Sequence, residues 1–272
     1  MAGKAFTRAV SPKLGECALT HFERLPIDAD AATLQHEAYE QSLRGAGFEV
    51  IRLPPLPEHA DGVFVEDTAL LLDGHAIVTR PGAPSRAGEA DSTAAALADH
   101  FELHRLAAGH LDGGDVLRIG RTLHVGLSSR TNIEGIAALS DIAGRLGFTV
   151  AAAQMSGILH LKSAATLAGN DSAGRPVLLY NSAAVDPRQF AGVEPLAVND
   201  DEADAANVLR AAERIIMPAG YPKTATCLRE RGFYVVEIGV SELEKAEAGV
   251  TCMSLISPAA VPPSGHDSVG GL

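Results

Sequence analysis

DTALLLDGHAIV, residues 67–78, contains the pattern that decides the fold: an apolar run, a short turn with glycine, and a second apolar run. Two such runs around a turn are typical of a β-hairpin. Similar blocks start at Asp115 (DVLRIGRTLHV) and Ser163 (SAATLAGNDSAGRPVLLY), and shorter ones at Asn207 (NVLRAAERIIM) and Cys252 (CMSLIS). Because the starts lie 48, 48, 44 and 45 residues apart, we interpret the chain as a five-fold internal repeat.

Alanine-rich segments with helical spacing lie between the hairpins, at residues 30–43, 92–104 and 132–146. The predicted unit is therefore strand, strand, helix. About five such units predict an α/β fold, a five-module α/β propeller whose ring is closed by strands from both ends of the chain. A ring hides sheet edges and brings the block starts near one axis. The alternative is a two-layer α/β sandwich with loosely similar hairpins.

The chain of 272 residues is long enough to bury a substantial core. We expect one catalytic domain over residues 1–257. The remaining segment, residues 258–272 (PAAVPPSGHDSVGGL), is rich in proline, glycine and serine, a composition that predicts a disordered tail.

The net charge of −12 disfavours a nucleic acid as partner and favours a cationic ligand. No segment approaches the roughly 18 apolar residues of a membrane span or the core of a signal peptide, so we expect a cytoplasmic protein without membrane contact. Three widely spaced cysteines predict reduced thiols. His100 and His104 fall on a predicted helix without an obvious third ligand, so no metal site is predicted.

The block starts are polar where a buried strand should be apolar. They read FVED, LDGGD, LHLKS and VTC, and they contain Glu66, Asp67, Asp112, His160 and Cys252. If they converge, they assemble carboxylates, an imidazole and a thiol, which is the inventory of a cysteine hydrolase with a cation-binding pair of carboxylates. Each residue taken alone also fits a structural role, as a buried thiol, a core histidine or a turn aspartate.

Seven strings, in order, resemble the dimethylarginine dimethylaminohydrolases, a family of the guanidine-modifying or pentein superfamily of five-module α/β propellers. The resemblance extends from about Leu14 to Ile256. The strings are KLGECAL, DGVFVEDTALL, RPGAPSR, LDGGDVL, VGLSSRTN, LHLKS and SELEKAEAGVTCMSL. LDGGD alone is unspecific, whereas seven strings at the family's spacing are very specific.

The resemblance implies that Cys252 is the nucleophile, that His160 is the general acid and base, and that Asp112 orients His160. It implies further substrate contacts from Asp61 and Glu66 on the guanidinium, Arg86 and Arg130 on the carboxylate, and Leu14, Asp67, Ala246 and Glu247. The family usually has valine and aspartate where this chain has Ala246 and Glu247. It more familiarly has Thr-Cys-Cys where this chain has Thr-Cys-Met, which leaves the nucleophile intact.

The implied activity is hydrolysis of Nω-methylated arginines to citrulline and dimethylamine or methylamine through a covalent thiouronium on Cys252, without metal or cofactor. Two alternatives use the same superfamily chemistry, an arginine deiminase and an amidinotransferase, although those relatives are generally longer. A third is a non-catalytic amino-acid-binding propeller in which Cys252 and His160 are structural. The expected partner is a small cationic amino acid, and the expected assembly is a monomer or homodimer.

Overall fold

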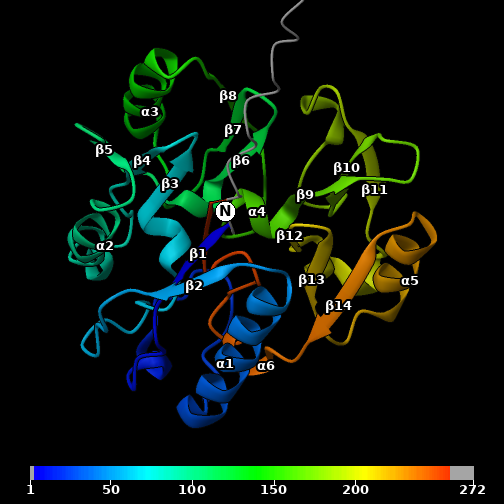
Figure 1. Ribbon diagram of the computed structural model, residues 1–272, viewed down its shortest axis with the longest axis horizontal. Coiled ribbons are helices and arrows are strands. Elements are labelled where there is room, and N and C mark those ends of the chain that lie inside the picture. The colour runs from blue at the N-terminus through cyan, green and yellow to red at the C-terminus, as the bar shows by residue number, and fades with distance from the viewer. Residues whose placement is uncertain (1–2, 258–272) are drawn as a thin grey trace, which may run out of the picture.

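The computed structural model describes residues 3–257, so the predicted tail at residues 258–272 lies outside the described residues. Within this range the strands form five three-stranded sheets arranged around a common centre, with helices α1, α2, α3 and α5 on the periphery (Figure 1). This arrangement confirms the predicted five-module α/β fold and excludes the two-layer sandwich. Among the described residues, no helix combines the length and apolar character needed to cross a membrane.

The elements follow one another regularly along the chain. In chain order the strands are β1 Lys4–Thr7, β2 Glu49–Arg52, β3 Ala69–Leu72, β4 His75–Val78, β5 Glu102–Arg105, β6 Val116–Ile119, β7 Thr122–Gly126, β8 Thr149–Ala153, β9 Ala165–Asn170, β10 Pro176–Tyr180, β11 Glu194–Ala197, β12 Leu209–Ala211, β13 Arg214–Pro218, β14 Tyr234–Ile238 and β15 Leu255–Ser257. The α-helices are α1 Ala29–Gly45, α2 Glu89–Leu97, α3 Ile133–Arg145, α4 Leu161–Ala164, α5 Pro222–Glu230 and α6 Ser241–Glu244. Six short 3₁₀ helices are η1 Leu14–Glu16, η2 Val65–Thr68, η3 Pro84–Arg86, η4 Gly113–Asp115, η5 Pro187–Gln189 and η6 Asp200–Ala206.

Each predicted hairpin is present as an antiparallel pair. In the first, β3 pairs with β4 from Ala69 opposite Val78 to Leu72 opposite His75. A crossover then returns the chain so that a third strand, here β5, pairs in parallel with the second. The third strands were not predicted, because they are short and only partly buried: β5 reads ELHR and contributes one apolar side chain.

The predicted helix at residues 92–104 was wrong at its end. Helix α2 stops at Leu97, and residues 102–105 form β5. The parallel pairing with β4 supplies inter-strand hydrogen bonds that a continued helix would forgo. His100 and His104 therefore do not share a helix face. In the fourth module, the crossover between β10 and β11 contains η5 where the other modules have an α-helix.

Strands from both ends of the chain close the ring, as predicted. β15 pairs antiparallel with β1, and β1 pairs in parallel with β2, so that Phe6 lies opposite both Leu255 and Ile51. Buried apolar side chains fill the space between each sheet and its covering helix, for example Leu139 and Ile142 of α3 against Leu123 of β7. The closure brings Cys252 to the centre, three residues before β15 begins at Leu255.

Short helical turns lead into the first strand of each hairpin. η2, η4, α4 and η6 precede β3, β6, β9 and β12, and contacts join η2 to η4, η4 to α4, and α4 to η6. Neighbouring block starts thus adjoin around the middle of the ring (Figure 1). The polar residues of the block starts are brought together by this symmetry.

Candidate active site

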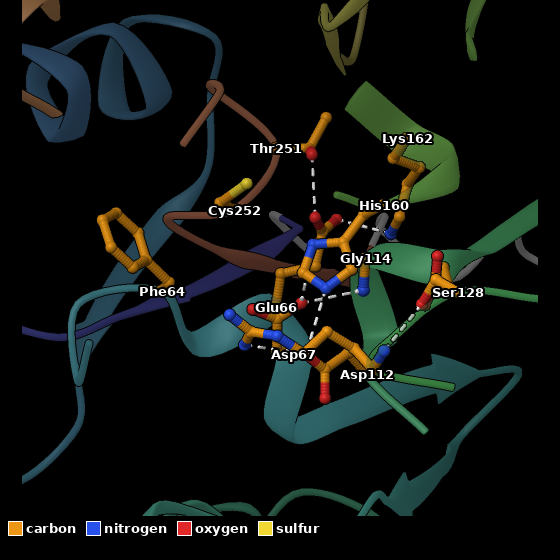
Figure 2. A network of polar contacts seen from close by, with 12 residues as sticks. Phe64, Glu66, Asp67, Asp112, Gly114, Ser128, His160, Lys162, Thr251 and Cys252 are labelled. Atoms are coloured by element: carbon orange, nitrogen blue, oxygen red, sulfur yellow. Dashed lines mark hydrogen bonds and ion pairs between the residues drawn. The ribbon is translucent and has the colours of Figure 1, made fainter. Parts of the chain in front are cut away.

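A small cavity lies among the block starts. It is lined by residues from all parts of the chain, namely Ala18, Asp61, Phe64, Asp67, Arg86, Arg130, Leu159, His160, Glu247, Ala248 and Cys252. The thiol, the imidazole and several predicted binding residues therefore share one small space. Figure 2 shows the polar network around it.

His160 and Asp112 form a buried pair. His160 Nε2 lies 3.0 Å from Asp112 Oδ2 (Figure 2). The other oxygen, Oδ1, accepts a 2.8 Å hydrogen bond from the backbone N–H of Gly82. Asp112 is completely buried, and its own N–H donates to Thr131 Oγ1. The carboxylate is fixed from two sides, so it can hold the imidazole ring in one orientation.

Asp67 lies on the opposite side of the ring. Its Oδ1 is 3.8 Å from His160 Nδ1 and accepts a 3.0 Å hydrogen bond from the backbone N–H of Gly114. Its Oδ2 accepts from Arg86. Burial opposes the ionisation of Asp67, but His160 and Arg86 outweigh it and lower the pKa of Asp67 to about 2.

The carboxylates around His160 favour its charged form. Burial alone would lower the pKa of this imidazole, but Asp67, the hydrogen bond to Asp112, and Asp115 together raise it to about 9. At neutral pH His160 is therefore an imidazolium, the state that a proton donor needs.

Steric constraints explain why both positions after Asp112 in LDGGD are glycines. A Cβ added to Gly114 would lie 2.7 Å from His160 Nδ1 and 2.8 Å from Asp67 Oδ1, and one added to Gly113 would lie 2.0 Å from the carbonyl oxygen of Glu66. The backbone of η4 can approach the imidazole this closely only without side chains. The sequence alone indicated a turn here, and the packing role of Gly114 was missed.

Cys252 follows a turn that begins at Gly249. The backbone N–H of Gly249 points at Sγ from 3.4 Å. Burial, followed by the charges of Glu66 and Asp67, raises the pKa of the Cys252 thiol to about 12. The direction of the two shifts favours a protonated thiol and a charged imidazole in the free site.

Glu66 lies beside the cysteine with both carboxylate oxygens bonded. Oε1 accepts from Lys162 Nζ at 2.5 Å and Oε2 from Thr251 Oγ1 at 2.7 Å (Figure 2). The backbone N–H of Glu66 donates to the carbonyl oxygen of Cys252 at 3.1 Å. Burial raises the pKa of Glu66 against the opposing charge of Lys162. Lys162 and Thr251 belong to the block starts LHLKS and VTC, but sequence reasoning assigned them no role.

Two further carboxylates hold the segment that follows η1. Both oxygens of Asp61 accept from the N–H of Ala18 at 3.2 Å. The carboxylate of Glu247 accepts backbone N–H groups from Thr20, His21 and Phe22. Because Ala18, Asp61 and Glu247 all line the cavity, these bonds form part of its wall.

Arg86 and Arg130, the two arginines predicted to bind the substrate carboxylate, differ in their hydrogen bonds within the protein. Arg86 donates to Asp67, to Glu89 at 2.8 Å and to the carbonyl of Phe64 at 2.8 Å. Arg130 donates to Thr20 Oγ1 at 3.2 Å, and its Nη1 lies 3.7 Å from Asp112. Both line the cavity, but Arg86 has fewer free N–H groups to offer a ligand.

Two residues predicted to contact the substrate do not line the cavity. Leu14 and Ala246 are buried in the apolar cluster that also contains Val250 and Met253. Ala248, two residues after Ala246, lines the cavity instead. Any contribution of Leu14 or Ala246 from a side chain is therefore to packing beneath the site.

The site also groups potential metal ligands. Donor atoms of Asp67, Asp112 and His160 lie within 4.8 Å of one another. The carboxylate oxygens of this trio already accept hydrogen bonds from protein N–H groups, including that of Gly82 and the guanidinium of Arg86. The arrangement supports proton transfer by a held imidazole beside a thiol.

No family model matches the chain. Among curated proteins, the N(G),N(G)-dimethylarginine dimethylaminohydrolase of Streptomyces coelicolor is 37% identical over 260 residues, which cover 93% of this chain and 96% of that protein. The Pseudomonas aeruginosa enzyme, solved as a cysteine-to-serine mutant complexed with citrulline, superimposes with a TM-score of 0.87 at 31% identity and covers 94% of this chain and 99% of its own. A histidine-to-glycine dimethylarginine dimethylaminohydrolase, solved as an adduct with S-methyl-L-thiocitrulline, gives a TM-score of 0.86 at 31% identity, covering 94% and 100%. A central cavity with a thiol, a held imidazole and carboxylates, together with this identity over nearly the whole length, places the chain in the dimethylarginine dimethylaminohydrolase family.

Proposed function

We propose that this protein hydrolyses Nω-methylated arginines, such as asymmetric dimethylarginine and monomethylarginine, to citrulline and dimethylamine or methylamine. One observation carries the proposal: Cys252, the His160–Asp112 pair and the carboxylate of Asp67 meet at one small cavity. Family membership gives this arrangement its substrate class. The cytoplasmic location, the monomeric or homodimeric state and the single domain over residues 1–257 stay predictions from the sequence.

The substrate itself activates the nucleophile. In the free site, burial and the charges of Glu66 and Asp67 oppose a thiolate at Cys252. A bound guanidinium cation places positive charge beside the same group, which lowers the thiol pKa and lets the thiol proton pass to solvent. The thiolate then forms only when its substrate is in place.

The first chemical step joins sulfur to carbon. The Cys252 thiolate attacks the guanidinium carbon, and the imidazolium of His160 gives its proton to the departing dimethylamine as the carbon–nitrogen bond breaks. A thiouronium remains on Cys252, and His160 is left neutral. The raised pKa of His160, about 9, keeps it protonated at the start of this step.

The second step reverses the proton transfer. Neutral His160 takes a proton from water, the resulting hydroxide attacks the thiouronium carbon, and the carbon–sulfur bond breaks to release citrulline. The Cys252 thiolate regains a proton as the product leaves. Asp112 keeps the same ring orientation through both steps, since its carboxylate is fixed by Gly82.

Different residues bind the guanidinium and the α-carboxylate of the substrate. We assign the guanidinium to Asp61 and Asp67 on the cavity wall, with Glu66 acting from beside Cys252. Arg130 suits the α-carboxylate because its guanidinium lines the cavity and keeps free N–H groups. The contact of Arg86 with the same carboxylate stays a prediction, since Asp67 and Glu89 already take much of its donor capacity.

A substrate panel tests the proposal against its rivals. Incubation with arginine, monomethylarginine and asymmetric dimethylarginine should give citrulline together with methylamine or dimethylamine from the methylated substrates. Ammonia and citrulline formed fastest from arginine would instead indicate a deiminase, and citrulline-free transfer of an amidino group to an added amine would indicate a transferase. Binding without any product would identify a non-catalytic propeller.

The pH dependence of kcat/KM should show the titration of His160. Because the pKa of His160 is raised to about 9, its protonated form persists to that pH and kcat/KM should fall above it. Asp112→Asn removes a group that raises this pKa, so the alkaline fall should move to lower pH, and kcat should drop as well. Asp99→Asn, at an exposed position, is the matched control. An unchanged alkaline limb in Asp112→Asn would contradict the role given to this pair.

A further inference from the structure

A second cluster of potential metal-ligating side chains lies in the module formed by β3, β4 and β5. His75 opens β4, and Glu102 and His104 belong to β5. In the parallel register His75 lies opposite Glu102, and His104 is two residues farther along the same strand. Side chains two apart on a strand share a face, so all three residues project to one side of the sheet.

Their donor atoms lie at separations that suit a single ion. His104 Nε2 is 3.2 Å from His75 Nδ1, and Glu102 oxygens are 3.5 Å from His75 Nδ1 and 3.8 Å from His104 Nε2. Ligands about 2.0–2.2 Å from a tetrahedral Zn²⁺ are separated by about 3.3–3.6 Å. The separation between His75 and Glu102 meets this condition, and the other two lie within about 0.2 Å of it.

The two imidazole rings lie close together without stacking, and solvent reaches them. The ring centroids of His75 and His104 are 5.2 Å apart, and the ring planes are tilted by 49° to each other. The side chains of His75, Glu102 and His104 are 27%, 69% and 21% exposed. Solvent can therefore reach the cluster, and water can supply further ligands.

The cluster is separate from the catalytic cavity. His75 lies at the turn end of the β3–β4 hairpin, opposite Leu72, whereas Asp67 precedes the other end of β3. In Figure 1 the strands of this sheet follow one another outward in the order β3, β4, β5, so that β4 and β5 lie farther from α4 at the centre than β3 does. None of the three residues lines the catalytic cavity.

We propose that His75, Glu102 and His104 form a surface site for a divalent transition-metal ion, with Zn²⁺ as the reference ion. Zn²⁺ and its neighbours bind both imidazole and carboxylate, whereas Ca²⁺ and Mg²⁺ prefer oxygen ligands, so the two imidazoles select for the former. The ion takes the space where the two histidines otherwise share one hydrogen bond. Because the ligands come from two neighbouring strands, the bound ion clamps β4 to β5.

Competition titration of the full-length protein against a chromophoric Zn²⁺ chelator tests the site. The titration is done in a Cys252→Ser background, which removes the catalytic thiol as an alternative ligand. One equivalent of Zn²⁺ should bind. His75→Gln and His104→Gln should each weaken binding by about 100-fold or more, since even the loss of a group that only supports a ligand costs about 10–100-fold. His110→Gln, an exposed histidine outside the cluster, should bind Zn²⁺ like the parent.

Two further readouts separate a metal site from a structural histidine pair. Co²⁺ should give the intense visible bands of a low-coordinate site in the parent and lose them in His75→Gln. The melting temperature should rise with added Zn²⁺ in the parent but not in His104→Gln, whereas both should melt alike with a chelator present. Zn²⁺ affinity that is unchanged by His75→Gln and His104→Gln would overturn the proposal. So would a single site that exists in wild type and vanishes in Cys252→Ser, because it would place the ion in the catalytic cavity.

Discussion

Cys252→Ser is expected to lower kcat for methylarginine hydrolysis by roughly four orders of magnitude or more while leaving the fold intact. The hydroxyl that replaces the thiol is far less acidic, and a guanidinium carbon is a poor electrophile because three nitrogens share its charge. Serine is close to cysteine in size, and the N–H of Gly249 can still donate to its oxygen. The substitution should therefore lower the rate of the chemical step without disturbing the packing around residue 252.

Citrulline formation and circular dichroism measured on the same preparation check this expectation. A native spectrum without citrulline is the predicted pair of results. Cys227→Ser and Cys17→Ser are the controls: Cys227 lies in α5, Cys17 is buried after η1, and neither lines the cavity. Both should be nearly silent in catalysis. If Cys252→Ser kept a tenth of the wild-type kcat, the nucleophile would have to be another group.

His160→Gly should uncouple the two chemical steps. Without an acid, dimethylamine cannot depart readily, so turnover of asymmetric dimethylarginine should fall by several orders of magnitude. An analogue whose leaving group needs no proton, such as S-methyl-L-thiocitrulline, can still be attacked by Cys252. The adduct then waits for a base that is missing, and it should accumulate.

Intact-protein mass spectrometry of His160→Gly after mixing with the analogue measures the adduct. A stable mass increase on the peptide that contains Cys252 is the predicted result. A buried histidine elsewhere offers a matched control: His124→Gly removes a ring of another module and should leave acid catalysis in place, provided that circular dichroism confirms its fold. Rapid multiple turnover of the analogue by His160→Gly would assign the base to another residue and refute the two-step role.

The repeat could be predicted from sequence because each hairpin is a local signal. The apolar runs around DGH and GR can be recognised without knowing their partners, and the spacing of the blocks then implies the ring. The third strands could not be found in this way. β5 reads ELHR, and its place is set by pairing with β4 across a crossover helix, which is a tertiary contact and not a local preference.

In the candidate site, too, some residues could be predicted from local sequence and others could not. Cys252, His160 and Asp112 could be proposed because polar residues interrupt apolar block starts, and the ring places them together. The partners of those residues were harder to find. Nothing local to Lys162 indicates that it pairs with Glu66, which is 96 positions away, and nothing local to Gly114 indicates an imidazole above it.

The contacts of Arg86 and of the surface cluster could not be predicted either, because they depend on tertiary packing. Arg86 was assigned to a substrate carboxylate by resemblance, whereas its contacts with Asp67 and Glu89 depend on how η2, η3 and α2 pack. His104 was placed on a helix, where a metal-binding partner was sought among residues of the same helix. Its neighbours in space are on β4 and β5, in positions that only the strand register reveals.

Labelling with a matched pair of electrophiles tests the central claim, that a cation brought beside the carboxylates makes Cys252 the nucleophile. Chloroacetamidine is a cation and chloroacetamide is its neutral analogue, and both alkylate thiols with loss of chloride. The account predicts that chloroacetamidine labels Cys252 at least about tenfold faster than chloroacetamide does, a factor that corresponds to about 1.4 kcal/mol. Glu66→Gln should reduce this preference, because it removes a charge beside Cys252 and leaves Lys162 unpaired.

Peptide mapping after limited reaction gives the answer for all three cysteines at once. The predicted result is modification of Cys252 by the cation, with Cys227 showing no preference between the two reagents because it lies outside the cavity. Equal rates for the cation and the neutral reagent at Cys252, unchanged by Glu66→Gln, would contradict the account.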